Sequence, residues 1–503
     1  MADNLFGRVV QEVSDRDKNF IIKPGQKPIS YAEAFSVAAH FAHVLANHGV
    51  VAGDRVAVQV EKCPEALFLY LACLRMGAIY LPLNIDYTPN EVAYFVQDAE
   101  PRVFVCSDKN REKIEAFFPV GNILTLGDDG TSGSLVDEAR AAPVEFSDAA
   151  LSMDDPAAIL YTSGTTGRSK GAMLSHGNLY SNAQSLKETW RYCEKDILLH
   201  ALPIFHTHGL FVATNVTLLS AASMIFLPKF NPDAIFLYLP EATVMMGVPT
   251  FYTRLLQDSR LNRHSVRTIR LFISGSAPLL KDTHRAWQER TGHAILERYG
   301  MTETNMNTSN PYDGLRLPGS VGLPLPGVEL RIADKDGNPL AKGEIGMIEV
   351  RGPNVFTGYW RMPEKTAAEF RPDGFFITGD LGTIDDDGYV HIVGRDKDLI
   401  ITGGFNVYPK EIESRIDALP GIEESAVVGL PHGDFGEGVT AFVVTKKGAA
   451  VTESAVLEAL AGDLAKFKLP KRVVIVEQLP RNSMGKVQKN LMRDTFRDLY
   501  GSG

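Results

Sequence analysis

The segment from Tyr161 to Gly171 reads Tyr-Thr-Ser-Gly-Thr-Thr-Gly-Arg-Ser-Lys-Gly and gathers hydroxyl side chains, glycines and a lysine on one short stretch. Glycines let backbone N–H groups approach an anion, the hydroxyls add donors, and Lys170 adds a cation. The stretch therefore predicts a loop that wraps a polyphosphate, although a flexible surface turn is the alternative. It is not a Walker A loop, because Gly171 rather than a serine or threonine follows Lys170.

Three further polar clusters could complete a nucleotide site. They are Ser274-Gly-Ser-Ala-Pro278, Glu297-Arg-Tyr-Gly-Met-Thr-Glu303 and Thr378-Gly-Asp-Leu381. Tyr299 offers an aromatic face to a base, Thr302 a hydroxyl to a phosphate, and Glu303 a carboxylate suited to Mg²⁺. Asp380 could accept hydrogen bonds from both hydroxyls of a ribose. Each cluster is weak evidence alone, since an aspartate in a turn is usually only a turn residue.

Short β-branched runs alternate with helical patterns through the first half of the chain, and these elements must position the clusters. Strands are predicted at 56–60, 78–81, 102–106, 157–161, 197–201, 224–227, 243–246 and 269–273, with helices at 64–76 and 177–190 and a charged helix from Asn110. Such alternation is typical of parallel sheets with helices on their faces, which bind ligands beyond the carboxyl ends of the strands.

The pattern changes after Arg316, where prolines and glycines separate short strands at 328–332, 346–351 and 389–393, which predicts a small β-barrel-like subdomain. A mixed region follows, with strands at 399–402, 425–429, 440–445 and 472–476 and helices at 410–417 and 453–465. The expected fold class is α/β. A large N-terminal domain at 1–395 contains parallel-rich sheets flanked by helices plus the small β subdomain, and 396–503 forms a small mobile α+β domain.

The composition is that of a globular protein of 503 residues, 45% hydrophobic, with a formal net charge of −10. An acidic surface argues against nucleic-acid partners. The four cysteines are scattered and form no CxxC pair, which speaks against a zinc or disulfide framework. No signal-peptide pattern or membrane-spanning run is evident, so a cytoplasmic protein without a membrane partner is expected. No GxGxxG follows a first strand, which disfavours a nicotinamide enzyme.

In order and spacing, these clusters resemble the core motifs of the acyl-adenylating superfamily, which includes acyl-CoA synthetases, adenylation domains of peptide synthetases and beetle luciferases. The resemblance continues to Pro480-Arg-Asn-Ser-Met-Gly-Lys486, and the phosphate loop departs from it only at Ser169, where many members have proline. It implies an enzyme that uses ATP, Mg²⁺ and CoA. Such an enzyme activates an acid as its acyl-adenylate and then passes the acyl group to a thiol.

The resemblance also implies roles for individual residues. The expected nucleotide-binding residues are Thr162, Ser163, Gly164, Thr165, Thr166, Gly167, Lys170, Ser276, Ala277, Pro278, Glu297, Arg298, Tyr299, Gly300, Met301, Asp380 and Arg395. The expected metal ligands are Glu303 and Thr166, and the expected catalytic residues are Lys486, Glu303, Thr302 and His206. Lys486 would bridge the carboxylate of the acid and the α-phosphate, which otherwise repel one another.

In this superfamily the C-terminal domain turns about a hinge, which here would be Asp396. One orientation delivers the catalytic lysine, and the other opens a tunnel for the thiol. The expected CoA-binding residues are Gly403, Gly404, Phe405 and Lys468. The two glycines would let a thin pantetheine arm pass, although they could also form a tight turn. Lys468 could contact CoA phosphates or lie on a solvated charged face.

The acid pocket should be walled by segments that follow strands, namely 206–209, 248–254 and the region of Ser274. Arg254 lies early in a helix opened by Pro249, and a cation there would suit the second carboxylate of a short diacid. Arg254 could equally pair with Asp258 on the helix surface. The residues leave these two interpretations about even.

The segments 200–210, 246–254 and 297–311 resemble malonyl-CoA synthetases, and this resemblance favours the diacid. It implies malonate as the substrate, with methylmalonate as a plausible second one. The expected acid-binding residues are Arg254, His206, Ser274 and Met306.

Other functions stay open. The alternatives within the superfamily are a short-chain acyl-CoA synthetase of other specificity and a stand-alone adenylation enzyme that loads a carrier protein. A luciferase-type oxidoreductase shares the adenylation step, and an inactive nucleotide-binding regulator is disfavoured because Glu303 and Lys486 are both present. A lysine acyltransferase acting on Lys486 would erase the charge of that side chain and so regulate the enzyme.

Overall fold

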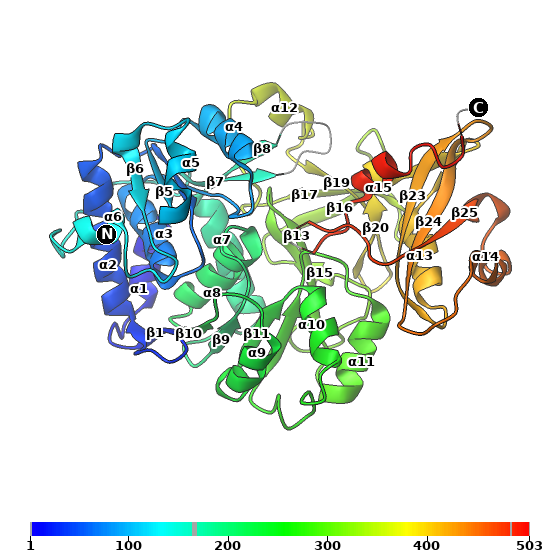
Figure 1. The fold of residues 1–503 in the computed structure, drawn as a ribbon, viewed down its shortest axis with the longest axis horizontal. Helices are drawn as coiled ribbons and strands as arrows, with labels where there is room; N and C mark the ends of the chain where they lie inside the picture. The colour runs from blue at the N-terminus through cyan, green and yellow to red at the C-terminus, as the bar shows by residue number, and fades with distance from the viewer. Residues whose placement is uncertain (1–2, 163–168, 483–484, 502–503) are drawn as a thin grey trace. The chain divides into compact units, whose positions relative to one another are not determined.

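The computed structural model describes residues 3–162, 169–482 and 485–501 and is shown in Figure 1. The chain divides into two compact units. The first contains Met1–Glu329 and Val350–Phe376, and the second contains Leu330–Glu349 and Ile377–Gly503. The α/β fold class predicted from the alternation of strands and helices is confirmed.

A seven-stranded sheet of the first unit has the order β18-β8-β7-β4-β3-β5-β6. Strands β3 to β7 pair in parallel, β8 is antiparallel to β7, and β18 is antiparallel to β8. The strands are β3 (Arg55–Gln59), β4 (Ile79–Pro82), β5 (Val103–Cys106), β6 (Ile123–Thr125), β7 (Pro156–Thr162), β8 (Lys170–Ser175) and β18 (Gly358–Tyr359). Its helices include α3 (Pro64–Met76), α4 (Pro89–Ala99), α5 (Arg111–Glu115) and α6 (Ser134–Ala139).

A nine-stranded sheet of the same unit has the order β15-β14-β13-β12-β11-β9-β10-β1-β2. The strands from β13 across to β1 are parallel, whereas β14, β15 and β2 run antiparallel to their neighbours. The strands are β1 (Asn19–Ile22), β2 (Ile29–Ser30), β9 (Ile197–His200), β10 (Ser223–Phe226), β11 (Val244–Gly247), β12 (Leu271–Ser274), β13 (Leu296–Met301), β14 (Asn305–Ser309) and β15 (Leu323–Pro324). The carboxyl ends of β9, β11, β12 and β13 therefore meet at one edge, where ligands of such sheets bind.

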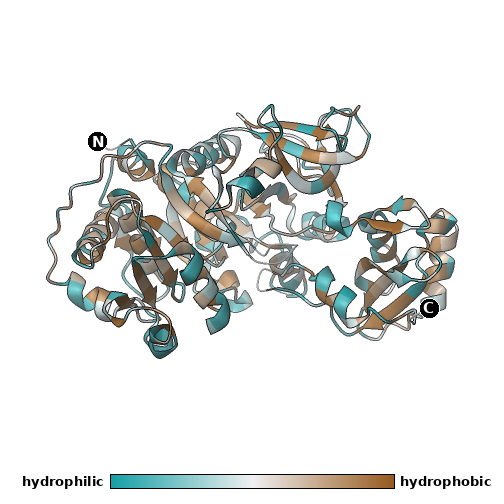
Figure 2. Ribbon diagram, turned by 90° about the horizontal axis from the view of Figure 1, so that it is seen from above, coloured by the Kyte–Doolittle hydropathy of each residue, from teal (hydrophilic) through white to brown (hydrophobic). Residues whose placement is uncertain are grey.

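Helices of the first unit begin where capping residues and prolines predict. Ser175 caps α7 through a reciprocal hydrogen-bond pair with Asn178, and Pro249 opens α10. The remaining helices are α1 (Leu5–Glu12), α2 (Tyr31–Asn47), α7 (His176–Thr189), α8 (Thr214–Leu219), α9 (Pro232–Tyr238), α10 (Pro249–Leu256), α11 (Lys281–Thr291) and α12 (Pro363–Ala368). Figure 2 shows hydrophobic strands beside helices that carry many hydrophilic residues, which is the pattern expected when one helix face packs on a sheet.

The second unit holds two smaller sheets. The four-stranded sheet β16-β17-β19-β20 is the β-rich subdomain predicted after Arg316. In the other sheet, β23 and β24 form a long antiparallel ladder and β25 pairs in parallel with β24. The elements are β16 (Glu329–Ala333), β17 (Gly346–Arg351), β19 (Phe376–Ile384), β20 (Val390–Arg395), β21 (Ile400–Thr402), β22 (Phe405–Val407), α13 (Pro409–Asp417), β23 (Ile422–His432), β24 (Gly436–Thr445), α14 (Glu453–Ala461), β25 (Arg472–Val476) and α15 (Lys489–Thr495).

Within the described part of the chain, no helix combines the length and apolarity needed to cross a lipid bilayer.

Candidate active site

The predicted polyphosphate loop connects two paired strands. Thr162, the last residue of β7, lies opposite Lys170, the first residue of β8, and its Oγ1 is 3.5 Å from the carbonyl oxygen of Lys170. The strand β8 was not predicted, because the glycines and serines around it indicated only a loop. Five of the expected phosphate ligands lie outside the described residues: Ser163, Gly164, Thr165, Thr166 and Gly167. Their roles stay predictions.

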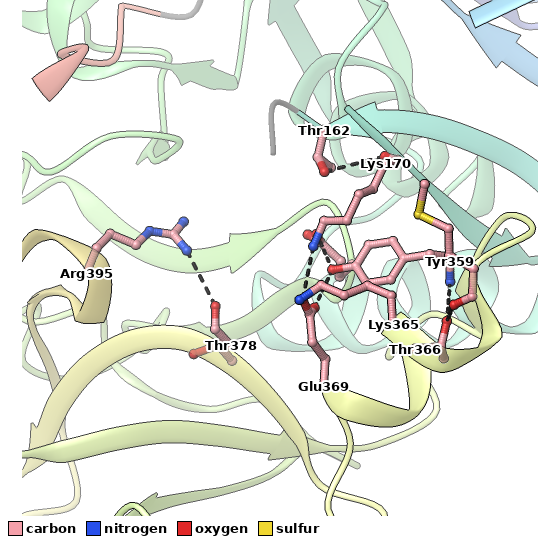
Figure 3. A network of polar contacts seen from close by, with 10 residues as sticks. Thr162, Lys170, Tyr359, Lys365, Thr366, Glu369, Thr378 and Arg395 are labelled. Atoms are coloured by element: carbon pink, nitrogen blue, oxygen red, sulfur yellow. Dashed lines mark hydrogen bonds and ion pairs between the residues drawn. The ribbon is translucent and has the colours of Figure 1, made fainter. Parts of the chain in front are cut away.

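The ammonium group of Lys170 lies in a network of charged and phenolic side chains (Figure 3). Its Nζ is 3.0 Å from Glu369 Oε1 and 4.1 Å from the centre of the Tyr359 ring. The Tyr359 hydroxyl lies 2.6 Å from Glu369 Oε2 and 3.0 Å from Glu303 Oε1. Lys365 Nζ lies 2.8 Å from Glu369 Oε1. The expected phosphate lysine and the expected metal carboxylate are thus linked through two residues that the sequence did not single out.

The expected metal ligand, Glu303, lies in the turn of the β13–β14 hairpin. Its side chain is buried and meets the Tyr359 hydroxyl. Among the described residues, no group of three or more histidine, cysteine, aspartate or glutamate side chains is arranged so that it could hold a metal ion. Mg²⁺ typically takes only one or two protein carboxylates and completes its shell with phosphates and water, so a single buried carboxylate such as that of Glu303 fits this ion.

The same hairpin carries the other residues of the predicted cluster Glu297–Glu303. Tyr299 is buried, and a Cβ at Gly300 would lie 1.8 Å from the carbonyl oxygen of Asn305, so only glycine fits there. Met306 pairs with Gly300 across the hairpin and is buried. Glu297 Oε1 lies 3.2 Å from His284 Nδ1 inside the protein, and burial raises the pKa of Glu297.

Arg298 is a buried cation at the same edge of the sheet. The residue is 4% exposed, and its Nε and Nη2 have no hydrogen-bond partner among the described residues. Burial lowers its pKa to about 9, so the guanidinium is still charged at neutral pH. A Cβ at Gly275 would lie 2.4 Å from Arg298 Cζ, which shows how closely the guanidinium packs on that glycine. A buried charge without a partner destabilises a folded protein, so we expect an anionic ligand to pair with this guanidinium.

Polar groups with unmet hydrogen bonds lie near Arg298. Ser274 Oγ and His208 Nε2 are buried and have no partner in the described structure. His208 Nδ1 lies 3.2 Å from Ser276 Oγ, and Ser276 adopts a left-handed backbone with φ of 71°. Burial, followed by the charge of Arg298, holds the pKa of His208 well below its usual value. His208 is therefore neutral, and His206, two residues earlier, is half-buried.

Arg254 lies in the last turn of α10 and is exposed. Asp258 does not take it as a partner, because Asp258 Oδ2 lies 2.6 Å from Nη2 of Arg260 instead. The described residues offer Arg254 no ion pair. The helix-surface pair that competed with the diacid interpretation is therefore not formed.

The second unit brings Asp380 and Arg395 together. They are opposite each other in β19 and β20, and Arg395 Nε lies 2.8 Å from Asp380 Oδ1. The backbone N–H of Asp380 donates to Thr378 Oγ1, and Arg395 Nη1 lies 3.4 Å from the Thr378 carbonyl oxygen. The aspartate is thus held in place beside a cation, and its expected role at the ribose stays a prediction.

The remaining predicted residues lie on loops of the second unit. Lys486 is exposed, and its backbone N–H donates to Asn482 Oδ1. Gly403 and Gly404 form the turn of the β21–β22 hairpin with φ of 56° and 81°, so the tight-turn interpretation is confirmed. The exposed Phe405 stacks on Phe467 at 4.5 Å between ring centres.

Two further predicted residues of this unit are charged. Lys468 Nζ lies 2.7 Å from Glu411 Oε1, so its charge is already partnered. Asp396 begins a short 3₁₀ turn between β20 and β21 and is exposed.

Sequence reasoning missed Tyr359, Lys365, Glu369 and His208. Tyr359 and Glu369 meet Lys170 because β18 pairs with β8, and Lys365 contacts Glu369 in turn. The Lys170–Glu369 contact joins residues 199 positions apart. No local pattern around Tyr359 announces such a pairing. His208 lay inside a segment that was expected to wall the acid pocket, and the buried strand ahead of it was the available signal.

Two models of known protein families match this chain. The family model of AMP-binding enzymes matches residues 10–360, and that of the AMP-binding enzyme C-terminal domain matches residues 411–486. Malonate–CoA ligase from Arabidopsis thaliana is 33% identical, over 98% of this chain and 89% of its own length.

Two solved structures are similar over nearly the whole chain. ATP-bound MatB from Rhodopseudomonas palustris matches with a TM-score of 0.97 and 61% identity, covering 99% of this chain and 100% of that one. The o-succinylbenzoate CoA synthetase MenE from Bacillus subtilis, in complex with the acyl-adenylate intermediate OSB-AMP, matches with a TM-score of 0.86 and 28% identity over 98% of both chains.

Proposed function

Since the chain belongs to the family of AMP-binding enzymes, we propose that it is an ATP-dependent ligase that joins malonate to coenzyme A. Malonate attacks the α-phosphate of ATP, pyrophosphate leaves, and malonyl-adenylate forms. The thiol of CoA then attacks the acyl carbonyl carbon and AMP leaves. Methylmalonate is a second substrate of the same chemistry, and a short-chain synthetase of other specificity is the competing function.

The observation that carries the choice of acid is the buried, unpaired guanidinium of Arg298. A monocarboxylic acid spends its only carboxylate on the adenylation step, so it leaves a buried cation without a partner. A diacid brings a second carboxylate that can pair with it. The family resemblance implies a nucleotide-binding role for Arg298, but its close packing on Gly275 and the neighbouring His208 favour the acid. Arg254, exposed and without an ion pair in the described structure, would draw the diacid in.

The nucleotide half of the proposal assigns one task to each residue. Lys170, with the preceding loop, holds the β- and γ-phosphates, Tyr299 meets the adenine, and Asp380 and Arg395 orient the ribose. Mg²⁺ neutralises triphosphate charge when it is bound at Glu303. Lys486 bridges the attacking carboxylate and the α-phosphate.

The remaining roles follow the order of the two half-reactions. His206 and Met306 line the acid pocket and Thr302 touches the α-phosphate. The C-terminal domain, 396–503, turns about Asp396 between the half-reactions, and Gly403, Gly404, Phe405 and Lys468 meet CoA in the second one. An acyltransferase that modifies Lys486 would switch off the first step. The cytoplasmic location expected from the sequence stays a prediction.

The test is pyrophosphate release with malonate, methylmalonate, propionate and acetate, with and without CoA. We expect malonate to exceed propionate by about 10⁴ in kcat/KM, because sites with buried polar groups reject analogues that leave those groups unpaired. The Arg254→Ala variant should lose malonate turnover selectively and still bind ATP. Equal use of malonate and propionate by the unmodified enzyme would remove the diacid from the proposal.

A further inference from the structure

Glu369 is a shared counter-ion, because two lysines and one phenol converge on it (Figure 3). Lys170 and Lys365 lie 3.0 and 2.8 Å from its Oε1, and the Tyr359 hydroxyl lies 2.6 Å from its Oε2. The Lys170 and Glu369 side chains are 18% and 19% exposed, so solvent screens this ion pair only in part. Burial alone would raise the pKa of Glu369, but the hydrogen bonds from its partners lower it, so the carboxylate is charged.

The Tyr359 hydroxyl has one proton and two carboxylates within reach. It lies 2.6 Å from Glu369 and 3.0 Å from Glu303. Burial, then the charges of Glu303 and Glu369, raises the pKa of Tyr359, so the phenol keeps its proton. The hydroxyl can donate to only one carboxylate at a time. A cation bound to Glu303 would satisfy that carboxylate and leave the hydroxyl to Glu369.

We propose that Glu369 is a positioning residue that holds the Lys170 ammonium group before ATP binds and hands it to the triphosphate. The inference rests on the proposed function, in which Lys170 contacts phosphate. After Lys170 leaves, Lys365 and Tyr359 still contact the Glu369 carboxylate. The transfer of Lys170 from Glu369 to the triphosphate therefore costs little free energy. The triphosphate therefore competes with an internal carboxylate for Lys170, whereas AMP, which lacks the β- and γ-phosphates, does not.

Glu369→Gln tests this competition because it removes the charge and keeps the shape. Binding of ATP and of AMP is measured by calorimetry in EDTA and again with Mg²⁺, in the absence of acid and CoA. ATP in EDTA should bind about fivefold more tightly than to the unmodified protein, which is the usual worth of a partly exposed ion pair. The AMP dissociation constant should not change.

Two further variants, both in α12, which ends just before Glu369, serve as controls for this measurement. Glu364→Gln removes an equal charge from an exposed position of α12 and should change neither constant. Lys365→Ala leaves Glu369 with Lys170 as its one lysine partner in the described structure, so ATP should bind about threefold more weakly. Because Lys365 is 45% exposed, this variant should fold even if Glu369→Gln does not.

Turnover separates positioning from general damage. In Glu369→Gln, KM for ATP should fall and kcat should change by less than about twofold, because Lys170 has already passed to the triphosphate when the chemical step begins. A rise in KM with a fall in kcat would overturn the inference, as would equal shifts for ATP and AMP or no shift for either. Unmodified protein that binds neither ATP nor AMP would overturn the proposed function itself.

Discussion

The residue on which the proposed chemistry depends most is Lys486. Two anions must approach each other in the first half-reaction, and an ammonium group that contacts both lowers the barrier. Lys486 is exposed on a loop of the second unit, where a lysine needs no structural role. The position of Lys486 alone would not identify it as a catalytic residue. That role comes from the resemblance of the segment 480–486 to a family motif.

Lys486→Gln should lower the rate of malonyl-adenylate formation by about 10²–10³, the usual cost of losing one preorganised charged group. ATP–pyrophosphate exchange measures this rate. Thiolysis of preformed malonyl-adenylate should stay close to normal, since that step does not need the bridge. Lys447→Ala, at another exposed lysine of the same unit, is the control and should be silent. Because glutamine mimics an acylated lysine, full activity of Lys486→Gln would also remove regulation by acylation.

At the scale of elements, the end of β12 decides where the Arg298 guanidinium lies. Gly275→Ala would place a Cβ 2.4 Å from Arg298 Cζ and 2.6 Å from its Nε and Nη1, so the guanidinium must move. We expect kcat/KM for malonate to fall about a hundredfold, because a displacement of about 1 Å in a binding group has that effect. ATP affinity, measured by calorimetry, should be kept.

The matched control for that variant is Gly462→Ala. Gly462 has an ordinary φ of −82°, and a Cβ there would meet no atom within 4 Å. Malonate kinetics that match the unmodified enzyme in Gly275→Ala would show that Arg298 is not an acid ligand.

The sequence predicted some elements better than others, because only some elements are determined by their own residues and their immediate neighbours. The helix α3 was predicted with its observed bounds, since Pro64 opens it and the left-handed Gly77 ends it. The strand β25 was also predicted with its observed bounds. By contrast, β8 and the two-residue β18 exist because they pair with distant strands, and no pattern within them announces this. The Lys170 network depends on that pairing, so it could not be predicted.

At the scale of the whole molecule, the two units should respond to acid in opposite directions. His176, His200 and His208 are buried in the first unit, and burial lowers the pKa of each; that of His176 falls to about 4. Asp417 in the second unit is partly buried, and this burial raises its pKa to about 6. Each histidine takes up a proton more readily when the first unit unfolds, whereas Asp417 holds its proton more firmly when the second unit is folded.

The direction of these pKa shifts decides how the stability of each unit changes with pH. The neutral histidines contribute fully to the free energy of unfolding of the first unit above pH 6.5. This contribution is lost as the pH falls toward 4, at up to about 1.4 kcal/mol per histidine per pH unit. The penalty of the partly buried Asp417 carboxylate is complete above pH 6 and disappears as the pH falls toward 4. Between pH 7 and pH 5 the first unit should therefore become easier to unfold, while the second should gain from Asp417.

The two responses can be measured separately, because all three tryptophans, Trp190, Trp287 and Trp360, belong to the first unit. Urea unfolding followed by tryptophan fluorescence reports on the first unit, and native-state hydrogen exchange in β23 and β24 reports on the second. The fluorescence midpoint should move to lower urea at pH 5. Asp417→Asn should strengthen protection in β23 and β24 at pH 7 but not at pH 4, since a neutral side chain avoids the penalty only where the aspartate is ionised. A fluorescence midpoint that does not change with pH, or equal protection in the variant at both pH values, would contradict the burial of these groups as the origin of the response.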